Sequence, residues 1–450
     1  MNNSIMTKKS ILYTIEQLFK IANPNGRVIY DINIKKDFRE VVICFRETDK
    51  RIKFNLVEKN AWYDLVNGNS REMHWINNAR GTYKIPVLFW ADEDLPFVTL
   101  NDYDVIFNGD IISSSFFMLS RWEEKLATQK DEHGRFRYIE SIACKYNFIT
   151  IPIVDEYALL LRKYLQILFP DVDLGKNIFH IKLSHDIDNI RRFETVKKAI
   201  RTLGGDLIKG RSFSLFNRSL KEWIQSFKSQ EKDPYFLGIC ELASLSQQYN
   251  MDSAFYFKTA DKSDYDTGYV IEEHVKRCIS YLQEQGFEIG FHPGYYTFQN
   301  YDKFIEEKER LDKVLGFTNY GGRQHYLRFD VNTTWRFWEQ AGLKYDSTVG
   351  YAEHEGFRCG TCHPFRPFDI DEDRELDVIE IPLIVMEGTL HSYRNLTIEE
   401  GINCVLELMN KCEEVEGVFT LLWHNTSIYR GWEDWFEEVY VNTILNGESI

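Results

Sequence analysis

The sequence predicts an α/β protein in which a smaller mixed α/β domain, residues 1–175, precedes a larger domain, residues 176–450, built on a parallel sheet. Two observations predict this order. The first 170 residues mix short strand-like runs with polar turns and a few helical stretches, whereas from Ile178 apolar strands alternate with helical segments. Such alternation is typical of parallel sheets, open or closed into a barrel.

The composition excludes several classes of protein. The 450 residues are 44% hydrophobic, enough for a packed core, and 54 Lys and Arg against 69 Asp and Glu give a formal net charge of −15. This acidity argues against a broad phosphate-binding surface, and so against a general nucleic-acid or anionic-membrane binder. It does not exclude a local basic groove. No apolar run approaches the roughly 18 to 20 residues that span a bilayer. Eight cysteines, mostly inside apolar segments, indicate a reducing compartment, and we expect a cytoplasmic protein.

The N-terminal domain is expected to begin with an amphipathic helix, Ile11–Ile21, in which Glu16 interrupts the apolar run before a signal-peptide core could form. Four strands and two helices are expected next: Val41–Phe45, Ile52–Leu56, Val87–Trp90, Val98–Leu100, Ser113–Leu126 and Val154–Leu168. The polar turn Asp131–Phe136 suggests no chemistry of its own. We expect this domain to position substrate or to dock a partner.

The C-terminal domain is expected to alternate strands with helices. Its strands are Phe179–Leu183, Ala254–Phe257, Glu288–Phe291, Tyr326–Phe329, Ile379–Leu383 and Val418–Trp423. Its helices are Phe236–Tyr249, Glu272–Gln285, Tyr301–Leu315, Thr333–Ala341 and Ile398–Cys412. Residues 195–232, rich in Lys, Arg, Ser and Gly, interrupt the alternation and are expected to form a surface insertion. Functional side chains of such folds gather beyond the carboxyl ends of the strands.

Two carboxylates and an imidazole follow the first of these strands, in Ser184-His185-Asp186-Ile187-Asp188. In an extended segment Asp186 and Asp188 point to the same side, where a cation could relieve their repulsion. Such carboxylates are costly to bury unless they are paired or bind a metal. The plain alternative is a helix N-cap or turn that uses one Asp.

Other strand ends carry histidines. His292 follows Glu288–Phe291 and precedes Pro293-Gly294, so a turn presents it as a ligand, acid or base, although a lone His is usually structural. The segment Gly321–Asp330 is dense in hydrogen-bonding side chains, and His424-Asn425 follows Val418–Trp423. Three strand ends therefore carry Asp or His chemistry, and the series is more specific than any one member.

In this order the motifs resemble the NodB-homology polysaccharide deacetylase family over residues 178–430. The segments that carry the resemblance are Ser184–Asp188, Ser253–Phe257, Glu288–His292, Leu327–Phe329 with Ala341–Leu343, Tyr345–Thr348, Glu380–Leu383 and Leu422–Asn425. The resemblance implies a deformed (β/α) barrel that uses a divalent metal, zinc by expectation, to hydrolyse N-acetyl groups on sugars.

The resemblance also implies roles for single residues. Asp186 corresponds to the catalytic base, and Asp188 and His292 correspond to metal ligands. Arg328 corresponds to the arginine that orients the base, and His424 to the general acid. In amide hydrolysis these groups would activate a water, keep the base ionised and protonate the departing nitrogen.

One position departs from the family, whose second metal histidine comes four residues after the first, where this chain has Tyr296. Catalytic zinc sites hold three protein ligands and a water, so His325 is the expected replacement, His185 is the next, and a structural His325 stays the alternative. From the start of the Tyr326–Phe329 strand, His325 would need an unusual chain path, which Gly321-Gly322 would permit. Without a replacement, the metal is absent and the domain is a glycan-binding protein or a degenerate enzyme.

Aromatic and cysteine-containing segments complete the candidates. Tyr295, Tyr296 and Trp423 are expected to stack on a sugar ring, although aromatic residues this common are more often core. Cys359-Gly360-Thr361-Cys362-His363 matches a c-type haem attachment pattern, a match that we interpret as accidental. The surrounding loop, Phe357–Phe368, is expected to lie against the barrel mouth.

The sequence thus predicts a metal-dependent carbohydrate deacetylase that acts on an intermediate of cell-surface polysaccharide synthesis. Two other functions stay open, a non-catalytic glycan-binding or assembly protein on the same scaffold and a hydrolase of non-sugar C–N bonds. Bound metal and acetate release would separate them. The expected partner is a carbohydrate substrate, and neither a nucleic acid nor a membrane span is expected.

Overall fold

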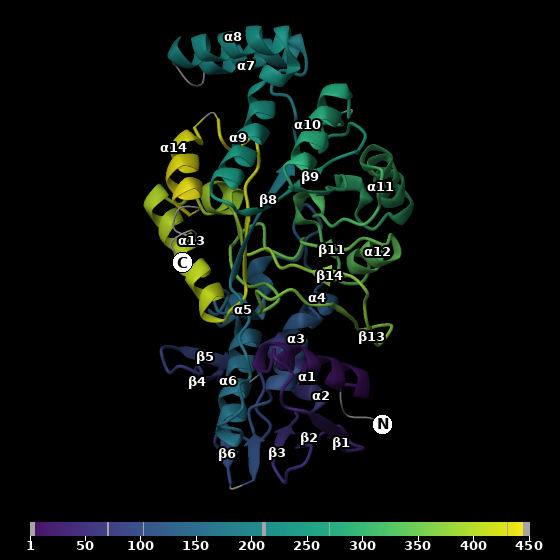
Figure 1. Cartoon of the computed structure of the whole chain (residues 1–450), viewed down its shortest axis with the longest axis vertical. Coiled ribbons are helices and arrows are strands. Elements are labelled where there is room, and N and C mark those ends of the chain that lie inside the picture. Colours follow the sequence, from purple (N-terminus) through teal and green to yellow (C-terminus); the bar gives the residue numbers. More distant parts are fainter. Residues whose placement is uncertain are drawn as a thin grey trace.

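The computed structural model describes residues 5–69, 72–101, 103–208, 213–269, 271–429 and 431–443. Figure 1 shows the N-terminal half at one end of an elongated body, with a second sheet and its helices in the middle. The helix pair α7 (Val196–Ile208) and α8 (Phe213–Lys228) lies at the opposite end. The mixed α/β class predicted from the sequence is confirmed.

The N-terminal half is built on a five-stranded sheet in the order β1-β2-β3-β7-β6. These strands are β1 Tyr30–Ile34, β2 Glu40–Phe45, β3 Arg51–Asn55, β6 Val98–Leu100 and β7 Asp104–Phe107. Only β3 and β7 pair in parallel, and the other neighbours are antiparallel. Buried and half-buried side chains alternate along β2, as expected for a strand with one face on the core. Helices α1 (Lys8–Ala22), α3 (Ile111–Leu119) and α6 (Ile153–Leu168) pack against one another beside the sheet.

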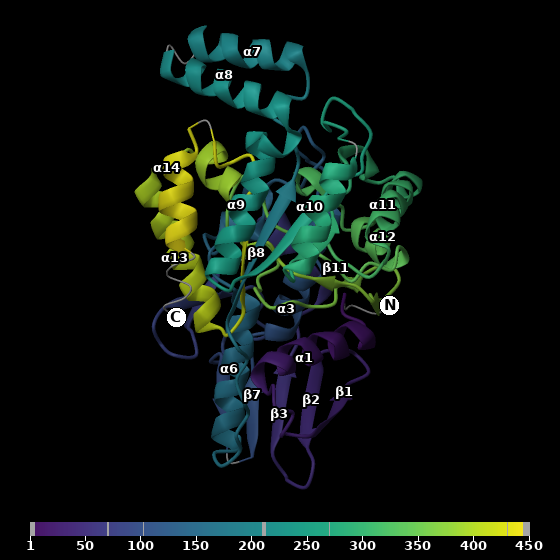
Figure 2. The same ribbon diagram turned by 45° about the horizontal axis from the view of Figure 1, so that its top comes forward.

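The second sheet is parallel throughout, in the order β10-β9-β8-β16-β15. Its strands are β8 His180–Ile187, β9 Asp252–Phe257, β10 Glu288–Phe291, β15 Val385–Met386 and β16 Val418–Leu422. All but the first residue of β8 are buried, which is typical of a strand with both faces covered. Helices α9 (Pro234–Gln248) and α10 (Glu273–Glu284) lie across one face of the sheet (Figure 2).

Single-residue bridges continue this pairing beyond β10. Gly322 bridges in parallel to Phe291 on one side and to Asp346 on the other, and β11 (Tyr345–Asp346) pairs in parallel with β14 (Ile379–Glu380). The series thus runs without interruption from β15 to β14. Closure of this series into the expected deformed barrel stays a prediction, as does the domain boundary near residue 175.

The remaining elements connect or cover the sheets. They include β4 His74–Asn77, β5 Lys84–Val87, β12 Phe368–Asp369, β13 Arg374–Glu375, α2 Lys59–Asn67, α4 Trp122–Leu126, α5 Ile142–Lys145, α11 Tyr301–Leu315, α12 Thr334–Gln340, α13 Ile398–Glu414 and α14 Glu433–Trp435. Across the described ranges, no helix combines the length and the apolar character that crossing a bilayer would require.

Three expected elements are wrong. The expected strand Val87–Trp90 shares only Val87 with the observed β5, Lys84–Val87. The strand Tyr326–Phe329 is absent: His325–Leu327 form a short 3₁₀ turn with left-handed φ values of 61° at Tyr326 and 52° at Leu327. The helix Ser113–Leu126 is broken at Arg121, whose φ is 53°. The Arg121 side chain is buried and donates to two buried carboxylates of its own segment, which stabilises the break.

The loop Phe357–Phe368 lies between the two halves rather than at the mouth of the second sheet. The Val154 amide donates to Gly360 O at 2.8 Å, and the Phe357 amide donates to Ile149 O at 2.8 Å. Arg358 is buried and pairs with Glu124 at 2.7 Å. The loop therefore fixes the N-terminal half against the C-terminal half.

Candidate active site

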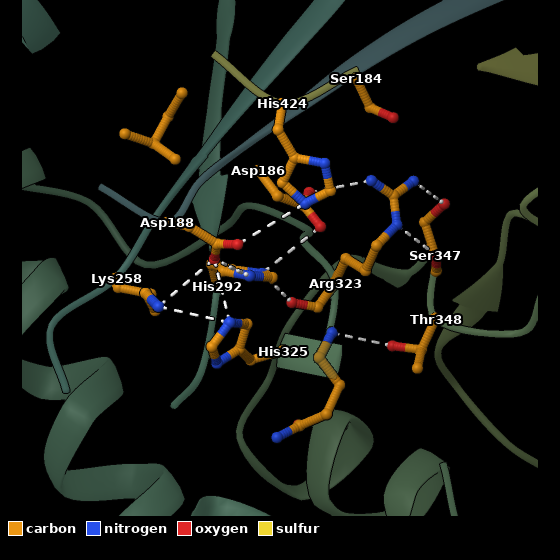
Figure 3. A network of polar contacts seen from close by, with 12 residues as sticks. Ser184, Asp186, Asp188, Lys258, His292, Arg323, His325, Ser347, Thr348 and His424 are labelled. Atoms are coloured by element: carbon orange, nitrogen blue, oxygen red, sulfur yellow. Dashed lines mark hydrogen bonds and ion pairs between the residues drawn. The ribbon is translucent and has the colours of Figure 1, made fainter. Parts of the chain in front are cut away.

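Four strand ends converge on one pocket of about 320 Å³ (Figure 3). Asp186 lies near the end of β8, and Asp188 follows that strand. Lys258 follows β9, His292 follows β10, and His424 lies just beyond β16. The carboxyl ends of neighbouring parallel strands meet at one edge, which is why these residues come together from distant parts of the chain.

Asp188, His292 and His325 form a compact group of metal-ligating side chains. The Nε2 atoms of His292 and His325 each lie 3.1 Å from Asp188 Oδ1, and one ligand atom from each residue falls within 4.8 Å of the others. The residue that pairs with the neighbouring strands in this segment is Gly322. His325 therefore lies beyond the carboxyl end of the paired position, rather than at the start of a strand, and this brings it to the pocket.

The hydrogen bonds of the two histidines fit a metal site. His292 Nδ1 lies 2.7 Å from Arg323 O, and His325 Nδ1 lies 2.9 Å from Asp266 Oδ1. Because both partners are acceptors, each Nδ1 donates a proton to its partner, and each Nε2, which lies at hydrogen-bond distance from Asp188 in the metal-free chain, is the atom that a metal would take. Burial would raise the pKa of Asp188, but Lys258 and His325 hold it well below its usual range. An ionised carboxylate and two imidazole lone pairs are a ligand set suited to zinc.

Lys258 lies inside the same group, although it was not among the residues predicted from the sequence. Its Nζ is 3.3 Å from Asp188 Oδ1, 3.4 Å from His325 Nε2 and 3.5 Å from Asp266 Oδ1. The side chain is 3% exposed, so the ammonium is compensated by these neighbours rather than by water. Lys258 therefore competes with any cation for the same donors. The one signal was a charged residue directly after an apolar strand.

Asp186 is paired with Arg323, not with Arg328. Arg323 Nη1 donates to Asp186 Oδ1 at 2.9 Å, while its Nε and Nη2 donate to the Ser347 carbonyl and hydroxyl at 2.8 and 3.0 Å (Figure 3). Both side chains of the pair are buried. Arg328 instead donates to His133 O and Tyr295 O at 2.7 and 2.6 Å. The assignment failed because the left-handed turn before Arg328 carries the chain away from Asp186.

His424 is held by Glu387, a second residue that the sequence did not indicate. His424 Nδ1 lies 2.6 Å from Glu387 Oε1, and His424 Nε2 lies 3.6 Å from Asp188 Oδ2. Burial lowers the pKa of His424, but the attraction of the buried Glu387 outweighs it and raises the value to about 10. His424 is thus protonated at neutral pH. Glu387 directly follows β15, so the strand-end rule would have found it had that short strand been recognised.

The aromatic residues chosen from the sequence do not form the pocket wall. Trp423 is fully buried, and its Nε1 donates to Ser427 O at 2.9 Å, so its ring cannot reach a sugar. Tyr296 is 42% exposed outside the pocket, below the ammonium of Lys303. Tyr295 is buried and stacks on Tyr265, with ring centroids 3.9 Å apart.

Other side chains line the pocket instead. They include Tyr265, Tyr326 and Tyr393, together with Arg135 from the N-terminal half. Arg135 Nη1 donates to Tyr326 O at 2.9 Å and its Nε donates to Asp131 at 2.7 Å. The polar turn Asp131–Phe136 therefore contributes to the site, although its sequence suggested no chemistry.

Two further candidates from the sequence have structural partners. His185 bonds Trp423 O at 2.8 Å and Ser253 Oγ at 3.0 Å, and it does not line the pocket. Cys362 lies with His363 and Asp155 in a second group of potential ligands. There the Asp155 oxygens accept bonds from Thr361 Oγ1 at 2.5 Å and from the Cys362 amide at 2.9 Å. These bonds satisfy the Asp155 carboxylate without a metal and tie α6 to the loop.

Comparisons with known proteins give a limited result. Residues 6–170 match the model of a family of unknown function, DUF7033. No curated protein matches the chain. Among solved structures, the crystal structure of a putative polysaccharide deacetylase from Mycobacterium smegmatis matches with 15% identity and a TM-score of 0.39, over 61% of this chain and 85% of the other. A TM-score this low leaves the function to be argued from the site itself.

Proposed function

We propose that the protein is a divalent-metal-dependent hydrolase that removes an N-acyl group, acetyl in the simplest case, from a carbohydrate. One observation carries the proposal. A single pocket places a three-residue ligand group between a carboxylate paired with a buried arginine and a histidine held in its protonated form. These are the parts that amide hydrolysis requires.

Asp188, His292 and His325 would hold the metal, which, when bound, supplies a Lewis acid that lowers the pKa of water and polarises the amide carbonyl. Asp186 accepts the proton of the attacking water, and Arg323 keeps that carboxylate ionised and oriented. His424 donates a proton to the nitrogen as the C–N bond breaks, and Glu387 stabilises its protonated form. The products are a carboxylic acid and a free amine.

The tyrosines that line the pocket support a carbohydrate substrate, because aromatic rings with a polar tip can pack on a sugar ring and hydrogen-bond its hydroxyls. The family resemblance implies N-acetylated sugars, and we take the substrate to be an intermediate of cell-surface polysaccharide synthesis, processed in the cytoplasm that the cysteine content predicts. It is part of the proposal.

The position of Lys258 favours a second candidate function. Its ammonium lies among the donors that a metal would need, so a metal-free pocket that binds glycans without hydrolysing them fits the same geometry. The two functions differ in whether the purified chain binds zinc and releases acetate.

Acetate release from N-acetylated chito-oligosaccharides, with elemental analysis of the purified protein, tests the proposal. We expect zinc-dependent release that falls by about 10²- to 10⁴-fold in Asp186→Asn, which removes the base but none of the proposed ligands. Arg323→Met should also fall steeply. Arg328→Met, which alters an arginine bonded outside the pocket, should keep most of the rate. No bound metal and no acetate with any divalent metal would favour the glycan-binding alternative.

A further inference from the structure

The helical hairpin formed by α7 and α8 stands away from both sheets (Figures 1 and 2). The two helices pack mainly on each other. They expose apolar side chains to a degree unusual for a surface element: Ile208 is 77% exposed, Phe213 is 70% exposed and Phe227 is 83% exposed. Isolated exposed apolar residues need no explanation, but a contiguous set on one element does.

Four apolar side chains of α8 form one stripe, and the exposed Leu215 lies outside it. Phe213, Leu220, Ile224 and Phe227 follow the spacing i, i+7, i+11, i+14, which keeps them within about 60° of arc at 100° per residue. Ile224 and Phe227 are exposed, so the stripe does not face the protein core.

Lysines flank the α8 stripe on one side. On the same helical wheel, Lys221 lies about 60° from Ile224, and Lys228 lies about 40° from Ile224. Both side chains are exposed, and neither forms an ion pair with a described residue. The stripe and its lysines therefore present an apolar strip with a cationic border.

Helix α7 also exposes apolar side chains beside basic ones. Val196, Ile200 and Ile208 are exposed and span about 120° of arc. Lys197 and Arg201 are exposed and lie about 100° and about 140° from Val196, on either side of Ile208. The buried Leu203 and Ala199 lie about 20° and about 60° from Val196, on the side of it away from Ile200.

The charge of the hairpin opposes that of the chain. The described residues of α7 and α8 hold six basic side chains and two acidic ones, in a chain whose formal net charge is −15. Two of the six basic side chains are neutralised, because Arg218 pairs with Glu222 and Lys198 pairs with Glu194. The cationic border consists of the other four, Lys197, Arg201, Lys221 and Lys228, which form no ion pair with a described residue.

We propose that the α7–α8 hairpin docks on an anionic lipid surface, with its apolar stripe among the acyl chains and its Lys and Arg at the phosphate headgroups. Exposed aliphatic and aromatic residues bordered by basic ones are the composition of interfacial amphipathic helices. A second copy of the chain fits less well, because a two-fold contact would bring the same cationic borders together. A nucleic acid would satisfy the charges but leave the isoleucines and phenylalanines in water.

The position of the hairpin gives this docking a consequence for the pocket. Only residues 188–195 separate the end of β8, which carries Asp186, from the start of α7. The hairpin therefore rises from the end of the sheet at which the pocket opens. A docked hairpin would hold the pocket close to the lipid surface, whether or not the pocket hydrolyses an amide.

Co-sedimentation of the full chain with vesicles tests the proposal, using phosphatidylcholine mixed with phosphatidylglycerol and phosphatidylcholine alone. We expect binding to the anionic vesicles only. Phe213→Ser/Phe227→Ser should weaken binding at least tenfold, and Lys221→Gln/Lys228→Gln by about 25-fold, roughly fivefold per lysine. The matched controls Ile178→Ser, at an 89% exposed isoleucine, and Lys36→Gln/Lys176→Gln, at exposed lysines, should bind like the wild type.

Three results would overturn the proposal. The first is that the wild type does not bind anionic vesicles. The second is that the lysine variant loses binding while the phenylalanine variant keeps it, since the surface would then be a general polyanion binder. The third is a dimer in sedimentation-velocity experiments that Phe213→Ser/Phe227→Ser dissociates, since the apolar stripe would then be an interface between copies.

Discussion

Asp266 offers a test of the proposed metal group that leaves every proposed ligand in place. Its Oδ1 accepts the Nδ1–H of His325 at 2.9 Å, and the pKa of Asp266 is about 2 because bonds to His325 and the charge of Lys258 outweigh the opposing effect of burial. This carboxylate fixes the tautomer and the ring orientation of His325. Loss of such a supporting bond costs about 10- to 100-fold in metal affinity, or about 1.4 to 2.7 kcal/mol.

Two substitutions of Asp266 should reduce zinc affinity by different amounts within that range. Asp266→Asn keeps an oxygen that can accept from His325, so zinc affinity should fall by about tenfold, the lower end. Asp266→Ala removes the acceptor and should approach a hundredfold loss. Asp266 Oδ2 also accepts from the Tyr295 amide at 3.0 Å, so circular dichroism must show that the alanine variant remains folded.

The assay is competition for Zn²⁺ between the metal-free full chain and a chromophoric chelator. Asp264→Asn is the control, because this exposed carboxylate lies two residues away in the same loop. An unchanged affinity in folded Asp266→Ala would refute the assignment of His325 as a ligand through Nε2. An equal loss in Asp264→Asn would show that the effect is the general charge of the loop.

Lys258 and His185 provide two further tests. Lys258→Met removes an ammonium 3.3 Å from Asp188 and should strengthen zinc binding at least tenfold in the same competition assay. The reason is that like charges about 4 Å apart repel by about 4 kcal/mol at an effective dielectric constant of 20. Weaker zinc binding in this variant would make Lys258 part of the binding group. Burial lowers the pKa of His185 to about 4, whereas its pKa in the unfolded chain is about 6.5. Between these two pH values the unfolded chain binds a proton that the folded chain does not bind. The free energy of unfolding therefore falls by about 3 kcal/mol as the pH drops from 6.5 to 4. His185→Gln should reduce the loss of thermal-unfolding midpoint between pH 7 and pH 5, and equal losses in both proteins would contradict this linkage.

The strand-end rule explains how much of the site could be predicted. Asp186, Asp188, His292 and His424 each follow an apolar run long enough to be recognised as a strand, so their convergence followed from topology alone. The rule failed where strands were too short for periodicity to show. The pairing at Gly322 is a one-residue bridge and β15 has two residues, so Arg323 and Glu387 had no visible strand before them.

The role that we predicted for Gly321 and Gly322 from the sequence is wrong. We expected them to permit an unusual chain direction through their conformational freedom. In the structure neither has a positive φ; their role is close approach. A Cβ on Gly322 would lie 1.9 Å from Phe291 O, and one on Gly321 would lie 2.2 Å from the ring of Tyr345. A sequence shows that a residue is glycine but not what lies against it, so the tight strand contact at Gly322 could not be predicted.

That contact accounts for the order of groups in the pocket. Extended segments present alternate side chains to one face, so Asp186 and Asp188 of the β8 end face the pocket together. Arg323 and His325, which follow the bridge at Gly322, also alternate about Gln324, whose amide turns away to bond Gly294 O and Thr297 Oγ1. The two pairs meet in register: Arg323 bonds Asp186, and His325 lies 3.1 Å from Asp188. The proposed base and the proposed metal group are thus separated by a step of two residues on each segment, so a one-residue slip at Gly322 would remove both partners at once.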